Sequence, residues 1–224
     1  MHFNTHIQIG NHLFEKWNPK MKINMGKNAF VFGNIRPDII RKGAQDQHIF
    51  SKTRHVMTEI IDRLIEKGNR QTTAISEKSI LLGSLCHHVS DIFCRYHHDP
   101  KLYTDLRSHY QYEIGLHRHF IRLINENKLE QTWNDERYAD RKHGNEFMLF
   151  YNNFKTNDFI EQLISEVEAY SQEEPGFDLD IRYSIGNCNR VVETFLPIVM
   201  KDRDTHSTSA CLPETESIFW RDAI

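Results

Sequence analysis

Apolar residues recur every three or four positions along most of this chain, and this period constrains the fold more than any other feature. The pattern is clearest in residues 77–96, where Leu81, Leu85, Val89 and Ile92 fall on one side of a helix. No run rich in Val, Ile and Thr alternates apolar with polar positions as a half-buried strand does. The sequence therefore predicts an all-α protein, folded as a single-domain helical bundle.

Capping and breaking residues set the boundaries of the expected helices. The predicted helices cover residues 4–17, 52–67, 77–96, 108–126, 145–154, 158–170 and 179–200. Gly68 is expected to cap the second of them and Ser108 to begin the fourth. Because Gly33 and Pro37 interrupt an apolar strip, Asp38 is predicted to lie in a turn. The domain is expected to span residues 1–200, with a polar C-terminal tail at 201–224.

The charges of the chain are nearly balanced, with 28 basic and 31 acidic residues and a formal net charge of −3. This balance provides no positive surface for duplex nucleic acid. No apolar run approaches the roughly eighteen residues that span a bilayer, and no signal-peptide core is visible. We therefore expect no transmembrane segment and a cytoplasmic location.

Histidine is unusually frequent, with 14 residues, which indicates a use for imidazole. The cysteines Cys86, Cys94, Cys188 and Cys211 form no Cys-x-x-Cys pair, so free buried thiols are expected. A metal site in this chain is therefore expected to use nitrogen and oxygen ligands.

Two helical turns each pair an imidazole with a carboxylate. His87 and Asp91 are four residues apart, as are His109 and Glu113, so each pair shares one helix face, and His97 lies between them in the sequence. Imidazole nitrogen and carboxylate oxygen suit zinc or a similar divalent ion. Such pairs are also common on helix surfaces. Buried salt bridges from the acids to nearby arginines, Arg95 or Arg107, are the other alternative.

Four segments, in this order, resemble the bacterial zinc-dependent phospholipase C family, whose fold is related to the single-strand-specific zinc nucleases. They are Asn4-Thr5-His6, the Gly-x-x-x-Pro-Asp motif of residues 33–38, His87-x-x-x-Asp91-x5-His97, and His109-x-Gln111-Tyr112-Glu113. The two histidine–acid blocks are the most specific of these. The resemblance covers about residues 2–115, and beyond Glu113 only a generic helical pattern is visible.

The resemblance implies two zinc ions and leaves room for a third. It assigns the first ion to Asp38, an upstream histidine, His87 and Asp91, and the second to His97, His109 and Glu113. It assigns a third ion to Asp91 and His6. The upstream histidine is His48 in the alignment that we favour, with His55 as the alternative. The family completes the third site with a processed N-terminal Trp, for which Met1 or His2 would have to substitute.

The implied activity is hydrolysis of a phosphodiester by a metal-bound water, with Asp38 as both ligand and proton acceptor. The expected substrate is a phospholipid with a small polar headgroup rather than single-stranded nucleic acid. A metal-binding sensor or structural protein without turnover is one alternative. An HD-type metal phosphohydrolase built on His98 and Asp99 is another, although Pro100 should end the helix directly after that pair.

Overall fold

The computed structural model describes residues 1–21, 25–40, 50–70, 73–133 and 156–200. Within these ranges every regular element is a helix, so the predicted all-α fold is confirmed. The helices are α1 (Phe3–Met21), α2 (Lys27–Ile39), α3 (Phe50–Gly68), α4 (Ile75–Ile92), α5 (Arg95–His98), α6 (Pro100–Tyr103), α7 (Leu106–Asn125), α8 (Leu129–Trp133), α11 (Thr156–Gln172) and α12 (Phe177–Met200). The helix predicted at 145–154 and the tail at 201–224 lie outside the described residues.

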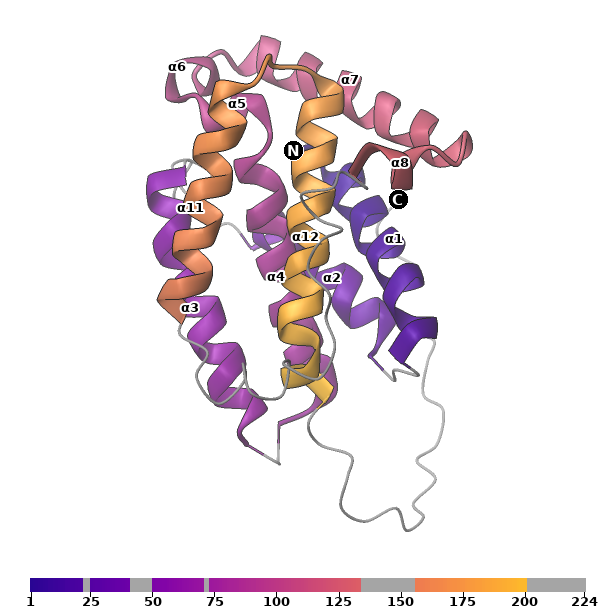
Figure 1. Cartoon of the computed structure of the whole chain (residues 1–224), viewed down its shortest axis with the longest axis vertical. Helices are drawn as coiled ribbons and strands as arrows, with labels where there is room; N and C mark the ends of the chain where they lie inside the picture. Colours follow the sequence, from indigo (N-terminus) through magenta and orange to yellow (C-terminus); the bar gives the residue numbers. More distant parts are fainter. Residues whose placement is uncertain (22–24, 41–49, 71–72, 134–155, 201–224) are drawn as a thin grey trace.

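Helix α4 is the centre of the bundle. It packs against α2, α3 and α12, and α12 runs alongside it through the middle of Figure 1. Nearly all of α4 is buried, polar residues included, because neighbours cover it on every side. A helix in this position places its ionisable side chains out of reach of bulk water, which makes their partners decisive.

The turn predicted around Asp38 is wrong, because α2 continues as a helix through Gly33 and Pro37 to Ile39. Pro37 has no N–H to donate to the Gly33 carbonyl one turn earlier. The Ser84 hydroxyl of α4 donates to that carbonyl instead, at 3.2 Å. The proline therefore leaves no unpaired acceptor at this position, and Asp38 lies in the last helical turn.

The predicted helix 77–96 is in fact broken at Phe93 and Cys94, between α4 and α5. In one continuous helix, positions 91 and 97 would be rotated by about 240° from each other and could not face one ion. The break lets His97 turn back toward Asp91. The short helix α6 also begins at Pro100, which the sequence suggested only as a stop.

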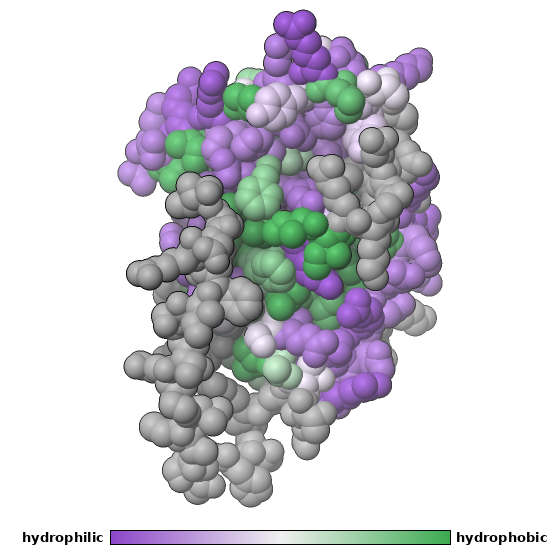
Figure 2. All heavy atoms as spheres, turned by 180° about the vertical axis from the view of Figure 1, so that it is seen from behind, coloured by the Kyte–Doolittle hydropathy of each residue, from purple (hydrophilic) through white to green (hydrophobic). Residues whose placement is uncertain are grey.

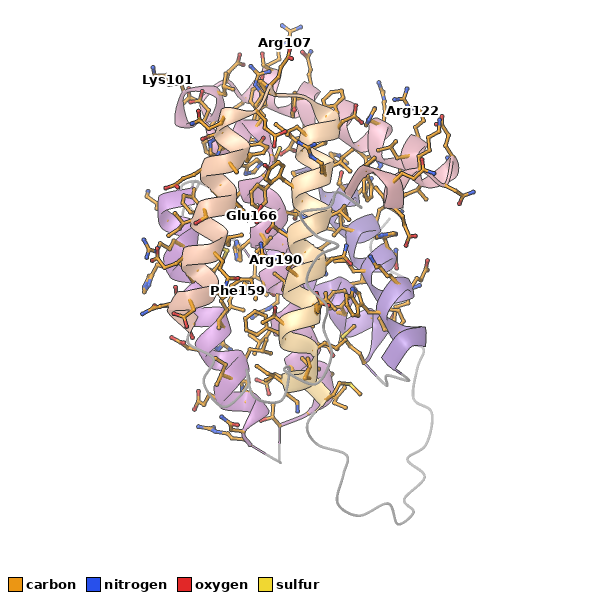
Figure 3. The ribbon with its side chains drawn as sticks, in the orientation of Figure 1. Lys101, Arg107, Arg122, Phe159, Glu166 and Arg190 are labelled. Carbon is orange, nitrogen blue, oxygen red and sulfur yellow. The ribbon has the colours of Figure 1, made fainter. Side chains whose placement is uncertain are left out.

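Helix α7 lies across one end of the bundle, at the top of Figure 1. Its N-cap is Asp105, whose carboxylate accepts the Ser108 N–H at 3.1 Å, rather than Ser108 as predicted. Lys101, Arg107 and Arg122 point outward from this end of the molecule in Figure 3. The opposite view in Figure 2 likewise shows hydrophilic residues along this end and hydrophobic residues gathered in the middle of the face.

Helices α11 and α12 pack side by side. Arg190 of α12 and Glu166 of α11 point toward each other in Figure 3 and form an ion pair at 3.0 Å. Phe159 packs edge to face against Phe195, with ring centroids 5.1 Å apart. None of the described helices combines the length and apolarity needed to cross a membrane.

Candidate metal centre

Three buried side chains from two helices form the first cluster, which comprises His6, His87 and Asp91. The Asp91 carboxylate faces the Nε2 atoms of both imidazoles. Its Oδ1 is 3.2 Å from His6 Nε2, and its Oδ2 is 3.3 Å from His87 Nε2. The imidazole rings stack with their centroids 4.0 Å apart. One carboxylate thus presents each of its oxygens to a different histidine.

Hydrogen bonds fix both imidazoles of the first cluster in one orientation. His87 donates its Nδ1–H to the Asn34 carbonyl at 2.8 Å. The Ser90 hydroxyl donates to the His87 carbonyl, so its oxygen is the acceptor for the His6 Nδ1–H at 3.2 Å. Both Nε2 atoms therefore face a carboxylate oxygen of Asp91. Two acceptors at this distance need a proton or a metal cation between them.

Asp38 extends the first cluster toward solvent. Its Oδ1 lies 3.7 Å from His87 Nε2, and its side chain is 23% exposed. This exposure exceeds that of Asp91 and Glu113. Asp38 is therefore the carboxylate of the centre that water reaches most readily.

The second cluster comprises His97 of α5 with His109 and Glu113 of α7. Glu113 Oε1 is 2.8 Å from His97 Nε2 and 2.9 Å from His109 Nε2, and the two imidazole nitrogens are 3.0 Å apart. Three ligand atoms thus meet at one point. The buried Cys94 sulfur also lies within 4.8 Å of the ligand atoms of His97 and Glu113.

The amino group of Met1 lies between the clusters. It is 2.7 Å from Asp91 Oδ1, 2.9 Å from Glu113 Oε1 and 2.7 Å from His97 Nε2. Burial lowers the pKa of this amine, but Asp91 and Glu113 outweigh burial and raise it well above its ordinary value. The position between the two clusters therefore favours a positive charge.

The same neighbours control the protonation of the acids and histidines. Burial alone would raise the pKa of Asp91 and of Glu113, but the Met1 amine and nearby imidazoles hold both pKa values well below their usual range. Burial, followed by the charge of the Met1 amine, lowers the pKa of His97 to about 4. Burial also lowers the pKa of His6. Asp91 and Glu113 are therefore anionic, and His6 and His97 neutral, near neutral pH, the protonation states that bind metal. His87 differs, because Asp91 outweighs burial and raises its pKa above the ordinary value.

The donor geometry of the first cluster fits zinc. Bonds of about 2.0–2.1 Å in a tetrahedron separate neighbouring ligand atoms by about 3.3 Å. The two nitrogen–oxygen distances in the first cluster, 3.2 and 3.3 Å, agree with this separation. Those in the second cluster are somewhat shorter. The ligands would be nitrogen and oxygen, the set that zinc accepts in catalytic sites.

The remaining sequence candidates do not all reach the centre. His48 lies outside the described residues, so its assignment stays a prediction. His55 is on the surface of α3, with its side chain 79% exposed and 3.2 Å from Glu59. Arg95 and Arg107 are exposed and form no ion pair with Asp91 or Glu113 in the described part of the chain.

The His98–Asp99 pair is not arranged as a metal site. Asp99 uses its carboxylate to cap α6, where Oδ1 accepts the Lys101 N–H at 2.8 Å. His98 instead packs against the Tyr170 ring, with centroids 5.1 Å apart. The geometry therefore gives no support to the HD-type alternative.

Sequence reasoning missed several members of the centre. Cys94 was expected only as a buried thiol, although it precedes His97 by three residues, a spacing that could have marked it. Asn34 contributes through its backbone carbonyl, which no residue pattern reveals. Ser90 could have been noticed only once His6 was known to pack against α4.

Comparison with curated proteins and with solved structures gives no match. The sequence does match the family described as zinc-dependent phospholipase C over residues 5–174, well over half of the chain. This range begins before His6 and includes all residues of both clusters. The resemblance found in four short segments therefore extends through α11, and the chain belongs to the zinc-dependent phospholipase C family.

Proposed function

We propose that the protein is a zinc-dependent phosphodiester hydrolase that acts on the headgroup of a phospholipid. The proposed ligands of the first ion are Asp38, His48, His87 and Asp91, and those of the second are His97, His109 and Glu113. His6 and Asp91 Oδ1, beside the Met1 amine, are the ligands proposed for a third ion. Membership in the family supports zinc and hydrolysis, and the residue assignments and the substrate are our proposal.

One observation carries the proposal: both histidines of the first cluster direct Nε2 toward the oxygens of one buried carboxylate, Asp91. Asn34 and Ser90 take up the protons on the other ring nitrogens. Acceptors on ring and carboxylate would repel each other in a buried site without a cation between them. A zinc ion at this position would bind a nitrogen of each ring and the oxygens of Asp91, while Asn34 and Ser90 hold the rings in place.

The catalytic chemistry would be divided between the metal and the protein. Zinc bound by these ligands would polarise the phosphoryl oxygens and bring the pKa of a water molecule toward neutrality. Asp38, the most exposed carboxylate of the centre, is placed to accept the proton of that water. The buried Asp91 lies between imidazoles and the Met1 amine, so it is suited to hold charge rather than to exchange protons with solvent.

Exposed apolar residues beside the proposed ligands support a lipid substrate. Ile39 and Ile40 directly follow Asp38, Phe3 precedes His6 by three residues, and Leu106 and Tyr110 flank His109. Leu106 is 73% exposed and Tyr110 is 59% exposed. A groove for single-stranded nucleic acid would instead need stacking aromatics along a basic track. Apolar residues next to a phosphodiester site suit acyl chains better.

Zinc content and substrate preference, measured on one preparation, test the proposal. Elemental analysis after desalting should find at least two zinc ions per chain. Short-chain phosphatidylcholine or phosphatidylethanolamine should then be cleaved faster than a single-stranded oligonucleotide at equal zinc. His109→Ala should lose zinc and activity. His55→Ala, which changes an equally spaced histidine–glutamate pair outside the centre, is the matched control and should lose neither.

Each outcome separates one part of the proposal from another. Protein that holds zinc but cleaves none of the diesters would favour the sensor or structural alternative. Faster cleavage of the oligonucleotide than of both lipids would overturn the substrate but leave the centre intact. Protein without zinc would refute the assignment of both clusters.

A further inference from the structure

A buried carboxylate outside both clusters, Asp180, lies in the first turn of α12. The Tyr170 hydroxyl donates to its Oδ1 at 2.7 Å, while the Tyr112 hydroxyl and the Arg95 backbone N–H each donate to its Oδ2 at 3.0 Å. All three donors are uncharged. Burial raises the pKa of Asp180 to about 6 in spite of these bonds. The chain therefore keeps at this position an acid whose ionised form costs folding free energy near neutral pH.

One of the three bonds fixes the helix that carries His97. Arg95 begins α5, and the residue at its N-cap, Cys94, makes no side-chain capping bond. Asp180 accepts the Arg95 N–H, which is one of the first N–H groups of the helix and has no acceptor within it. A helix of four residues cannot hold its own shape, so external contacts must set the position of His97.

A second bond fixes the helix that carries the other two members of the second cluster. Tyr112 directly precedes Glu113 and follows His109 by three residues. The Tyr96 ring packs against the rings of Tyr112 and His109, with centroid distances of 5.0 Å and 5.3 Å. The Tyr112 hydroxyl binds the same Asp180 oxygen as the Arg95 N–H. A single oxygen atom therefore joins α5 to α7.

We propose that Asp180 is a positioning residue for the second cluster: it holds α5 and α7 at the spacing at which His97, His109 and Glu113 meet and bind zinc. This inference rests on the proposed zinc binding. The first cluster is oriented by different contacts, from Asn34 and Ser90. Loss of the Asp180 carboxylate should thus weaken one cluster and spare the other.

The test measures zinc affinity by chelator competition in two full-length backgrounds. His87→Ala removes a ligand of the first cluster, so zinc binding by this variant reports on the second cluster. His109→Ala removes a ligand of the second cluster, so its zinc binding reports on the first. Added to His87→Ala, Asp180→Asn should lower zinc affinity by about 10–100-fold, because its amide presents N–H groups to neighbours that are themselves donors. Added to His109→Ala, it should change affinity by no more than about twofold, as expected for independent sites.

Asp178→Asn is the matched control. Asp178 also lies in the first turn of α12 and also contacts α7, through His119 at 2.6 Å, but its side chain is 77% exposed. Asp178→Asn should leave zinc affinity unchanged in the His87→Ala and the His109→Ala backgrounds. Tyr112→Phe removes only the bond between Asp180 and α7 and should also lower the zinc affinity of the second cluster. It is the milder variant to use if Asp180→Asn folds poorly.

The outcomes distinguish this inference from the proposed function. Equal losses of affinity in both backgrounds, or no loss in either, would overturn the role of Asp180. If neither background binds zinc, the proposed function and this inference fall together. Selective loss from the second cluster in a protein that cleaves no diester would refute the proposed function and leave the inference standing.

Discussion

The crossing of α2 and α4 should be the most sensitive part of the fold to a single added methyl group. A Cβ on Gly83 would lie 2.2 Å from the Phe30 carbonyl oxygen and 2.9 Å from the Asn34 nitrogen. Both are backbone atoms of α2, so no side chain can move aside. Gly83→Ala should therefore push α2 away from α4, and with it Asp38 and the Asn34 carbonyl that orients His87.

The size of the effect follows from these distances. Relief of the contact with the Phe30 oxygen requires a shift of about 1 Å to reach ordinary van der Waals separation. Overpacking of this kind costs about 1–3 kcal/mol, and the helix propensity of alanine returns at most about 1 kcal/mol. A displacement of about 1 Å in a catalytic group can reduce the rate by about a hundredfold. We expect a modest loss of stability and a large loss of activity.

Urea unfolding followed by circular dichroism, zinc content and lipid hydrolysis should be measured together on Gly83→Ala. Gly176→Ala is the control, because no heavy atom lies within 4 Å of the added Cβ. It should behave like the wild type in all three measurements. If Gly83→Ala is as stable as the wild type and keeps its activity, the contact between α2 and α4 does not position the centre, and the reasoning is refuted.

Three further predictions concern pH, metal and a single hydroxyl. The folded pKa of Asp180, about 6, exceeds the ordinary 3.8, so the stabilising effect of its protonated form is complete below pH 3.8 and lost as pH rises through 6. Between pH 4 and 7 the metal-free wild type should lose about 2.4 kcal/mol relative to Asp180→Asn in urea unfolding, and parallel pH curves would contradict this. Chelation should lower the melting temperature, since zinc at a thousand times its dissociation constant stabilises by about 4 kcal/mol; identical melting with and without zinc would argue against a native metal site. Ser84→Ala should cost about 1–3 kcal/mol because it leaves the buried Gly33 carbonyl, already deprived of a partner by Pro37, without a donor. Ser79→Ala should cost less in the same assay, because the Ser79 hydroxyl donates to a helical carbonyl that already accepts a backbone N–H.

The helical period of the sequence was sufficient to predict the bundle and the meeting of each histidine–acid pair. His109 and Glu113 share a face of α7 because positions four apart on a helix always do, whatever surrounds them. That these side chains lie close together was therefore predictable, and that they bind zinc stays a prediction. The position of His97 was not derivable in this way, because it depends on a break after Ile92 that no glycine or proline marks.

The errors have a common physical origin in contacts between helices. Gly33 and Pro37 normally end a helix, but here Ser84 supplies the missing donor and the bare glycine permits close packing against α4. No role beyond the helix start was predicted for Asp180, because an acid in the first turn of a helix is an ordinary capping signal. Its bonds to Tyr112 and Arg95 join positions far apart in the chain, and a local pattern cannot reveal them.

The wide spacing of the proposed ligands along the chain also bears on how the centre is assembled during synthesis. His6 meets Asp91 across 85 positions, and the last proposed ligand is Glu113. Contacts between such distant positions form late, because the chain must first lose the entropy of closing a long loop. A nascent chain whose residue 113 is still inside the ribosome has no complete second cluster. Metal uptake would therefore report that α1, α4 and α7 have already docked, and a protease cut between residues 6 and 91 would separate ligands that only the folded protein holds together.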